Sequence, residues 1–228
     1  MIEPGFERDR ELFAQRWRVR WHDYVPAAVL VLAMLFAWLA RSQPGGMTSW
    51  GVSAAALMEG NYENVALHII AHGSLFHLLT NSLGLLEIGG LVTARLGSFA
   101  KGWARFLVAF VLSGLSSMIF FLSIHPQGTV PMIGASGAIY GMVGLLLGMR
   151  LIEDLEHVAL RSLPRALVSF VTNNVFFLAL LLIGGTLASI AERVAWEAHL
   201  GGFLFGLCVG PWLLPLDRDP GTSQRGLD

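Results

Sequence analysis

The sequence predicts an all-α membrane protein that crosses the bilayer with six transmembrane helices. Hydrophobic residues make up 54% of the 228 residues and charged residues only 14%, whereas an ordinary soluble domain carries roughly 25% charged residues. The mean hydropathy is +0.62. The apolar residues also fall into long runs, each close to the about 20 residues that a helix needs to cross a bilayer. We therefore expect a lipid bilayer around the protein and no nucleic-acid partner.

Six apolar runs define the expected helices. Their approximate spans are 24–40, 76–92, 103–124, 136–152, 166–190 and 196–214. The first run is long enough to span the membrane, so no cleavable signal peptide is expected. The stretch 41–75 is only partly apolar and is expected to form a loop or a helix lying in the membrane interface. The single cysteine, Cys208, lies within the sixth run, which excludes an internal disulfide and suggests a small buried packing residue.

The positive charges predict the orientation, because Lys and Arg are retained on the cytoplasmic side. Of the 15 Lys and Arg residues, all but Arg41 and Arg193 fall on one side of the six expected spans. Both termini are therefore predicted to be cytoplasmic, with a basic tail at 1–23, a six-helix membrane domain at 24–215 and a carboxyl tail at 216–228. Such a strong asymmetry favours a bacterial-type plasma membrane.

Four polar residues stand at the starts of expected helices. His77 and Asn81 lie near the start of the second helix, Ser136 begins the fourth, and His199 lies near the start of the sixth. Polar groups are costly in lipid and are functional candidates. Because even-numbered helices run inward in this topology, the four side chains are expected at a similar depth near the outer face.

Ser136 lies between glycines where a loop becomes a helix, in the stretch Gly134-Ala135-Ser136-Gly137. Glycine permits positive φ and close backbone approach, and a helix amino terminus leaves free N–H groups with a partial positive charge. An oxyanion could be stabilised there. The alternative is that Ser136 is only an N-cap in a glycine-rich packing helix.

The sixth helix supplies a possible partner, His199. Gly202, Gly206 and Gly210 recur every four residues after it and form one smooth face. The fourth helix has small residues of its own, so the two helices can approach closely and bring Ser136 and His199 into hydrogen-bonding range. The alternative is a structural histidine.

Three further side chains have candidate supporting roles. His77 and Asn81 share one helix face at a spacing of four residues, and both can donate hydrogen bonds to a developing oxyanion; the alternative is that Asn81 bonds a neighbouring helix. Tyr140 lies one turn after Ser136 and could pack against the His199 ring, or be an ordinary buried aromatic residue.

A metal site is not expected, although His68, His72 and His77 cluster before the second helix. The stretch contains no His-Glu-x-x-His motif and no obvious acidic third ligand. We expect neither a metal nor another cofactor.

Taken together, these motifs resemble those of the rhomboid family of intramembrane serine proteases. Gly134-Ala135-Ser136-Gly137 followed by Tyr140 is similar to the family's Gly-x-Ser-Gly-x-x-Tyr. His77 and Asn81 match its His-x-x-x-Asn, and Ala198-His199 with Gly202 and Gly206 matches its Ala-His-x-x-Gly-x-x-x-Gly. The order and spacing agree over 72–210.

The resemblance implies a six-transmembrane-helix rhomboid-like bundle and a Ser–His dyad. Ser136 would be the nucleophile and His199 the general base, while Asn81, His77 and the Ser136 backbone N–H would bind the oxyanion. Gly134, Gly137 and Tyr140 would support them. The implied substrates are transmembrane proteins cleaved near the outer membrane face.

Two other functions stay open on the sequence. One is a catalytically silent rhomboid-like protein that binds transmembrane helices, and the other is a small transporter in which His77, Glu87 and His199 relay protons. The chain also departs from the family at one point: many members carry a Trp-Arg pair in the first outer loop, where this chain has Glu63-Asn64.

Overall fold

The protein is a bundle of helices in the computed structural model, which describes residues 19–41, 46–97, 99–157 and 195–213. The long helices are α2 (Val25–Leu39), α5 (Leu75–Arg95), α6 (Phe99–Ile124), α7 (Ser136–His157) and α10 (Trp196–Val209). Shorter helices are η1 (Trp21–Tyr24), η2 (Gly46–Trp50), α3 (Ala54–Met58), α4 (Asn64–Leu67) and η4 (Gly210–Leu213). Within the described ranges the β pairing is a single antiparallel bridge between Val52 and Met132.

Three of the described helices are long and apolar enough to cross a membrane: Trp21–Leu39, Leu75–Arg95 and Phe99–Ile124. They correspond to the first three predicted spans and make this an integral membrane protein. The apolar part of α7, Ser136–Met149, is shorter, and α10 has 14 residues. The fifth predicted span, 166–190, and most of both predicted tails lie outside the described residues, so the count of six and the domain limits stay predictions.

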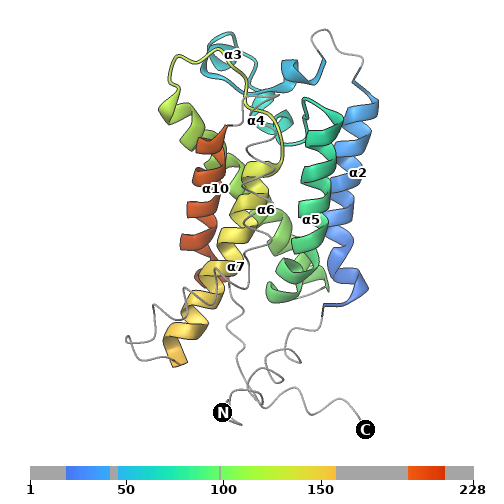
Figure 1. Cartoon of the computed structure of the whole chain (residues 1–228), viewed down its shortest axis with the longest axis vertical. Helices are drawn as coiled ribbons and strands as arrows, with labels where there is room; N and C mark the ends of the chain where they lie inside the picture. Colours follow the sequence, from blue (N-terminus) through green and yellow to red (C-terminus); the bar gives the residue numbers. More distant parts are fainter. Residues whose placement is uncertain (1–18, 42–45, 98, 158–194, 214–228) are drawn as a thin grey trace.

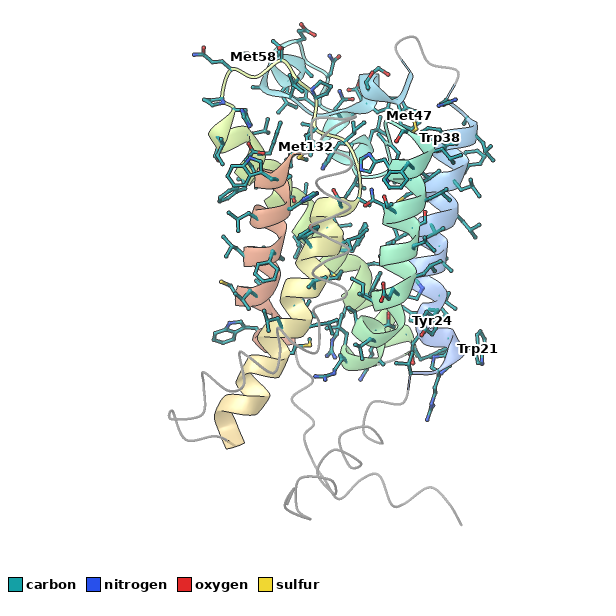
Figure 2. The ribbon with its side chains drawn as sticks, in the orientation of Figure 1. Trp21, Tyr24, Trp38, Met47, Met58 and Met132 are labelled. Carbon is teal, nitrogen blue, oxygen red and sulfur yellow. The ribbon has the colours of Figure 1, made fainter. Side chains whose placement is uncertain are left out.

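The long helices run in two opposite directions (Figure 1). The helices α2 and α6 run one way, and α5, α7 and α10 run the other way. The stretch 41–75, predicted to be a loop or interfacial helix, folds into η2, α3 and α4 at the end of the bundle where α5, α7 and α10 begin. We call this end the α4 end. Met47, Met58 and Met132 lie there, and Trp21 and Tyr24 lie at the opposite end (Figure 2).

The core lies between α2, α5, α6 and α7. Its largest fully buried side chains include Phe106, Phe110, Leu85 and Met142. Many equally apolar side chains point outward instead, as Leu83 does with 66% of its surface exposed. Outward-facing apolar residues are expected where lipid replaces water as the surrounding solvent.

The helices α7 and α10 run parallel and touch through their glycines. A Cβ on Gly202 would overlap the Gly137 carbonyl oxygen, and one on Gly206 would overlap that of Gly141. This is the close glycine-faced approach that the sequence predicts. The expectation for Cys208 is wrong, because this residue is exposed on α10: an apolar run in a membrane helix has a lipid-facing side as well as a packed one.

Candidate active site

Ser136 is the first residue of α7, and the segment before it is anchored on two sides. Val52 and Met132 exchange backbone hydrogen bonds of 3.0 and 2.8 Å. Two residues later the Gly134 N–H donates to the His68 carbonyl at 2.8 Å. Gly134 then turns the chain with φ +111°, a conformation that glycine adopts without steric cost. Backbone bonds from the preceding loop thus fix the point at which α7 begins.

His199 stands in the first turn of α10 and meets Ser136. Its Nε2 lies 2.7 Å from the Ser136 Oγ, and the contact is partly buried. A neutral imidazole can accept the hydroxyl proton at this distance, which is how a general base activates a serine. The parallel glycine contact between α7 and α10 explains why two residues 63 positions apart come together.

Tyr140 stacks on the His199 ring from one turn further along α7. The two ring centroids are 4.3 Å apart and the planes are parallel within 2°. This stacking restricts rotation of the imidazole and keeps its Nε2 directed at Ser136. The structure therefore brings together all three residues that the sequence singles out on these two helices.

Serines on α6 also hold the start of α10, and sequence reasoning missed them. The Ser117 hydroxyl donates to the carbonyl of Ala198, the residue before His199, and the Ser116 hydroxyl donates to the Gly201 carbonyl at 3.3 Å. The sequence signal that could have identified them is the presence of two hydroxyl side chains within an apolar span. Their partners lie more than 80 residues away, so no local pattern could identify them.

His77 and Asn81 reach the Gly134 turn from α5. A Cβ on Gly134 would lie 2.6 Å from the His77 Nε2 and 3.4 Å from the Asn81 Nδ2. Only a glycine leaves room for the His77 ring beside this turn, two residues before Ser136, and Asn81 lies next to it. The arrangement brings the His77 and Asn81 side chains close to the turn that leads into α7.

The Asn81 amide lies buried beside the Gly134 turn, and its Nδ2 donates no hydrogen bond to the described part of the chain. An unpaired buried donor costs about 1 to 3 kcal/mol, and a catalytic role is one of the reasons for which a protein keeps such a group. Within the described part of the chain, the helix-linking role considered for Asn81 therefore lacks its bond.

His72 and His68 lie in the loop before α5 and contact residues of the site. The His72 ring lies edge-on to His77, with centroids 5.0 Å apart. Burial, together with the nearby His77, lowers the pKa of His72 to about 4, so its ring is neutral at pH 7. Its Nδ1 then donates to the Ile70 carbonyl at 3.1 Å. The His68 Nδ1 bonds the Asn64 carbonyl at 3.0 Å, and these local bonds give both rings structural roles.

Asn64, where the family often has the arginine of a Trp-Arg pair, is a structural anchor of the loop. It is buried, and its Nδ2 donates to the Ser49 carbonyl at 3.1 Å and to the Gly51 carbonyl at 2.8 Å. Gly51 precedes Val52, which pairs with the segment leading to Ser136. The side chain of Asn64 is thus connected to the site through the loop backbone.

The comparisons with known proteins agree with these motifs. Residues 59–216 match the model of the Rhomboid domain. RHOMBOID-like protein 5 of Arabidopsis thaliana is 29% identical over 68% of this chain and 45% of its own length. Rhomboid protease GluP of Bacillus subtilis is 27% identical over 70% of this chain and 28% of its own. Rhomboid protease GlpG of Yersinia pseudotuberculosis is 31% identical over 64% of this chain and 46% of its own.

The matches cover different shares of this chain and of its relatives. The chain spans less than half the length of each of these three curated relatives. The family model, in contrast, covers well over half of this chain and includes every motif residue from His77 to His199. The chain therefore belongs to the rhomboid family.

Proposed function

We propose that this protein is an intramembrane serine endopeptidase that cleaves transmembrane proteins near the outer membrane face. The observation that carries the proposal is the 2.7 Å separation of the Ser136 Oγ and the His199 Nε2. Two relatives named as rhomboid proteases support it. No acidic third member is required, because the Tyr140 ring orients the imidazole by stacking.

In the proposed reaction the Ser136 Oγ attacks the scissile carbonyl carbon while its proton passes to the His199 Nε2. The tetrahedral intermediate collapses when His199 returns that proton to the leaving amine, which departs with a new amino terminus. Water then attacks the acyl-enzyme and loses a proton to His199. As the acyl–oxygen bond breaks, His199 returns this proton to the Ser136 Oγ, which regenerates Ser136 and releases the new carboxyl terminus.

The proposed oxyanion site consists of the Asn81 Nδ2, the His77 Nε2 and the Ser136 backbone N–H. The last is the first amide of α7, and such amides lack an intrahelical acceptor. The partial positive charge at the helix start favours an anion at the same point. Each preorganised donor is worth about 3 to 4 kcal/mol of transition-state stabilisation in measured cases.

The position of the proposed dyad near the α4 end supports cleavage close to one face of the membrane. A transmembrane helix hides its carbonyls in internal hydrogen bonds, so a substrate must unwind before Ser136 can attack it.

We assign the α4 end to the outer face. Among the described Lys and Arg residues only Arg41 lies at that end. The others lie on elements toward the opposite end: Arg20, Arg95, Lys101, Arg105 and Arg150. Both termini would then be cytoplasmic, in a bacterial plasma membrane.

Cleavage in reconstituted vesicles tests the proposal. The protein would be co-reconstituted with a single-span reporter whose outer end carries small and helix-breaking residues, and products would be identified by mass spectrometry. Ser136→Ala and His199→Ala should each abolish cleavage while the protein remains folded. Cleavage that persists in either variant would reject the dyad, and binding of the reporter without cleavage by the wild type would indicate a silent helix-binding protein.

Asn81→Ala tests the oxyanion site separately. Loss of one donor should lower kcat by about 10²- to 10³-fold and leave KM nearly unchanged, because the bond forms only as charge develops. An unchanged kcat would remove Asn81 from the site without affecting the dyad.

A further inference from the structure

The first turn of α10 carries the proposed base but lacks a side-chain cap of its own. The helix begins at Trp196, and the N-cap residue, Ala195, has no side chain that could bond the free amides. His199 is the fourth residue of this helix, and its N-cap residue makes no side-chain capping bond within the described part of the chain. Helix ends fray when their free amides lack partners, so the position of His199 depends on contacts with other elements.

Glu197 provides one of these contacts, with the end of α6. It is only 8% exposed, and its Oε1 lies 3.0 Å from the His125 Nε2. A carboxylate in the first turn is also favoured by the helix dipole. A carboxylate this deeply buried needs a hydrogen-bonding partner, and His125 supplies it.

His125 is itself held in place. It directly follows α6, and its N–H donates to the Phe121 carbonyl at 3.0 Å. Its own carbonyl accepts the Gly128 N–H at 3.0 Å. The ring lies against Phe121 with centroids 4.8 Å apart. These bonds fix the backbone of His125 at the end of α6, and its partly exposed ring contacts Phe121 and the Glu197 carboxylate.

Glu197 and His199 project from opposite sides of α10. Successive residues of an α-helix are rotated by about 100° around its axis. Glu197 and His199 are two residues apart, so their side chains are about 200° apart. His199 faces Ser136 on α7, and Glu197 faces His125 at the end of α6. Ala198 lies between them, and its carbonyl accepts the Ser117 hydroxyl. The turn that carries the imidazole is therefore held from both sides.

We propose that Glu197, through its bond to His125, is a positioning residue for His199. The pair fixes the rotation and depth of the first turn of α10, and so the distance from the imidazole to Ser136. This inference rests on the proposed function for its catalytic consequence. Misplacement of a catalytic group by about 1 Å can cost roughly 10²-fold in rate, so the pair should matter for catalysis although neither residue touches the dyad.

The test measures inactivation by a fluorophosphonate probe in detergent, as kinact and KI, for Glu197→Ala, His125→Ala and the double variant. Each single change should lower kinact about 10- to 100-fold with KI unchanged. The double variant should be no slower than either single variant, because both remove the same bond. Glu197→Gln, whose amide oxygen can still accept from His125, should recover most of the rate. Glu59→Ala removes an exposed carboxylate from the α4 end and serves as the matched control.

Hydrogen exchange provides a readout that does not need activity. The amides at the start of α10 should exchange faster in Glu197→Ala than in wild type, with α5 and α6 unchanged. Single variants that label within twofold of wild type, or single effects that multiply in the double variant, would overturn the positioning role. If the wild type fails to label at all, the proposed function fails, and unchanged exchange at the start of α10 would then overturn the positioning role independently.

Discussion

Gly134 makes the candidate oxyanion site possible because it has no side chain. The residue has φ +111°, and a Cβ at this position would lie 2.6 Å from the His77 Nε2. Two constraints therefore coincide at one glycine: a backbone conformation and a space for two donors. A comparison with another glycine of positive φ can separate the effect of the lost space from the effect of the backbone conformation.

Gly134→Ala should abolish or nearly abolish activity, because the new methyl group displaces His77 in addition to straining the backbone. Gly60→Ala is the matched control, since Gly60 also has positive φ, at +91°, but nothing lies within 4 Å of its Cβ position. The control should lose only about 1 kcal/mol of stability from backbone strain and keep full activity. Probe labelling and thermal unfolding of both variants would measure this, and equal loss of activity in the two would contradict the steric account.

At the residue scale, the sequence predicted the site residues at the helix starts. It did not predict the residues whose contacts hold those helix starts in place. Ser136, His199 and Tyr140 stand in short local motifs, and the structure brings their side chains together. Ser117 and His125 have no motif. Their contacts join α6 to α10 across 81 and 72 positions, and such contacts depend on how helices pack rather than on local spacing.

The α7–α10 interface joins the two halves of the dyad. Lipid is as apolar as the helix surfaces, so packing and hydrogen bonding rather than water exclusion drive helix association. Close packing needs small residues at the contact, and Gly202, Gly206 and Gly210 meet the α7 backbone directly. The separation of Ser136 and His199 is therefore a property of this interface.

Gly206→Ala should destabilise the fold by about 1 to 3 kcal/mol, the usual cost of overpacking, because its Cβ would overlap the Gly141 carbonyl oxygen. Gly84→Ala in α5 is the matched control, since its nearest neighbour would be the Ile139 Cγ2 at an ordinary 3.9 Å. That change should be neutral or stabilising, because alanine favours helix by up to about 1 kcal/mol over glycine. Thermal unfolding in detergent measures both, and equal melting temperatures would refute the interface.

Asn64 ties the loop at the α4 end through two side-chain hydrogen bonds. Asn64→Ala removes both bonds to the Ser49 and Gly51 carbonyls and should raise proteolysis and hydrogen exchange in 46–60. Each lost bond is worth about 1 kcal/mol. Asn61→Ala, a change of the same type at a less buried site in this loop, should have little effect. If the two variants behave alike, Asn64 does not anchor the loop.

At the element scale, the sequence predicted the long helices well, because a long apolar run is visible in it. The spans 76–92 and 103–124 lie within α5 and α6. The helices η2, α3 and α4 have four or five residues each, too few for a hydrophobic period to appear. The exposure of Cys208 was missed for another reason: beside lipid, apolar character does not distinguish a packed face from an outward one.

The whole molecule combines a lipid-facing exterior with a small polar site near one end. Three described helices meet the length and composition of membrane spans, and the rhomboid match covers 59–216. The site residues come from α5, α7 and α10, which all begin at the α4 end. The proposed hydrolysis needs water, and a polar site close to a membrane surface can receive water while the bilayer core stays closed.

The most direct test of the whole account is labelling by a fluorophosphonate probe, because it needs no knowledge of the natural substrate. The wild-type protein in detergent should form a covalent adduct that peptide mass spectrometry assigns to Ser136. Ser136→Ala and His199→Ala should remain unlabelled while showing the same thermal unfolding as wild type. A folded wild-type protein that takes up no probe, or an adduct that persists in Ser136→Ala, would contradict the dyad on which the proposed function depends.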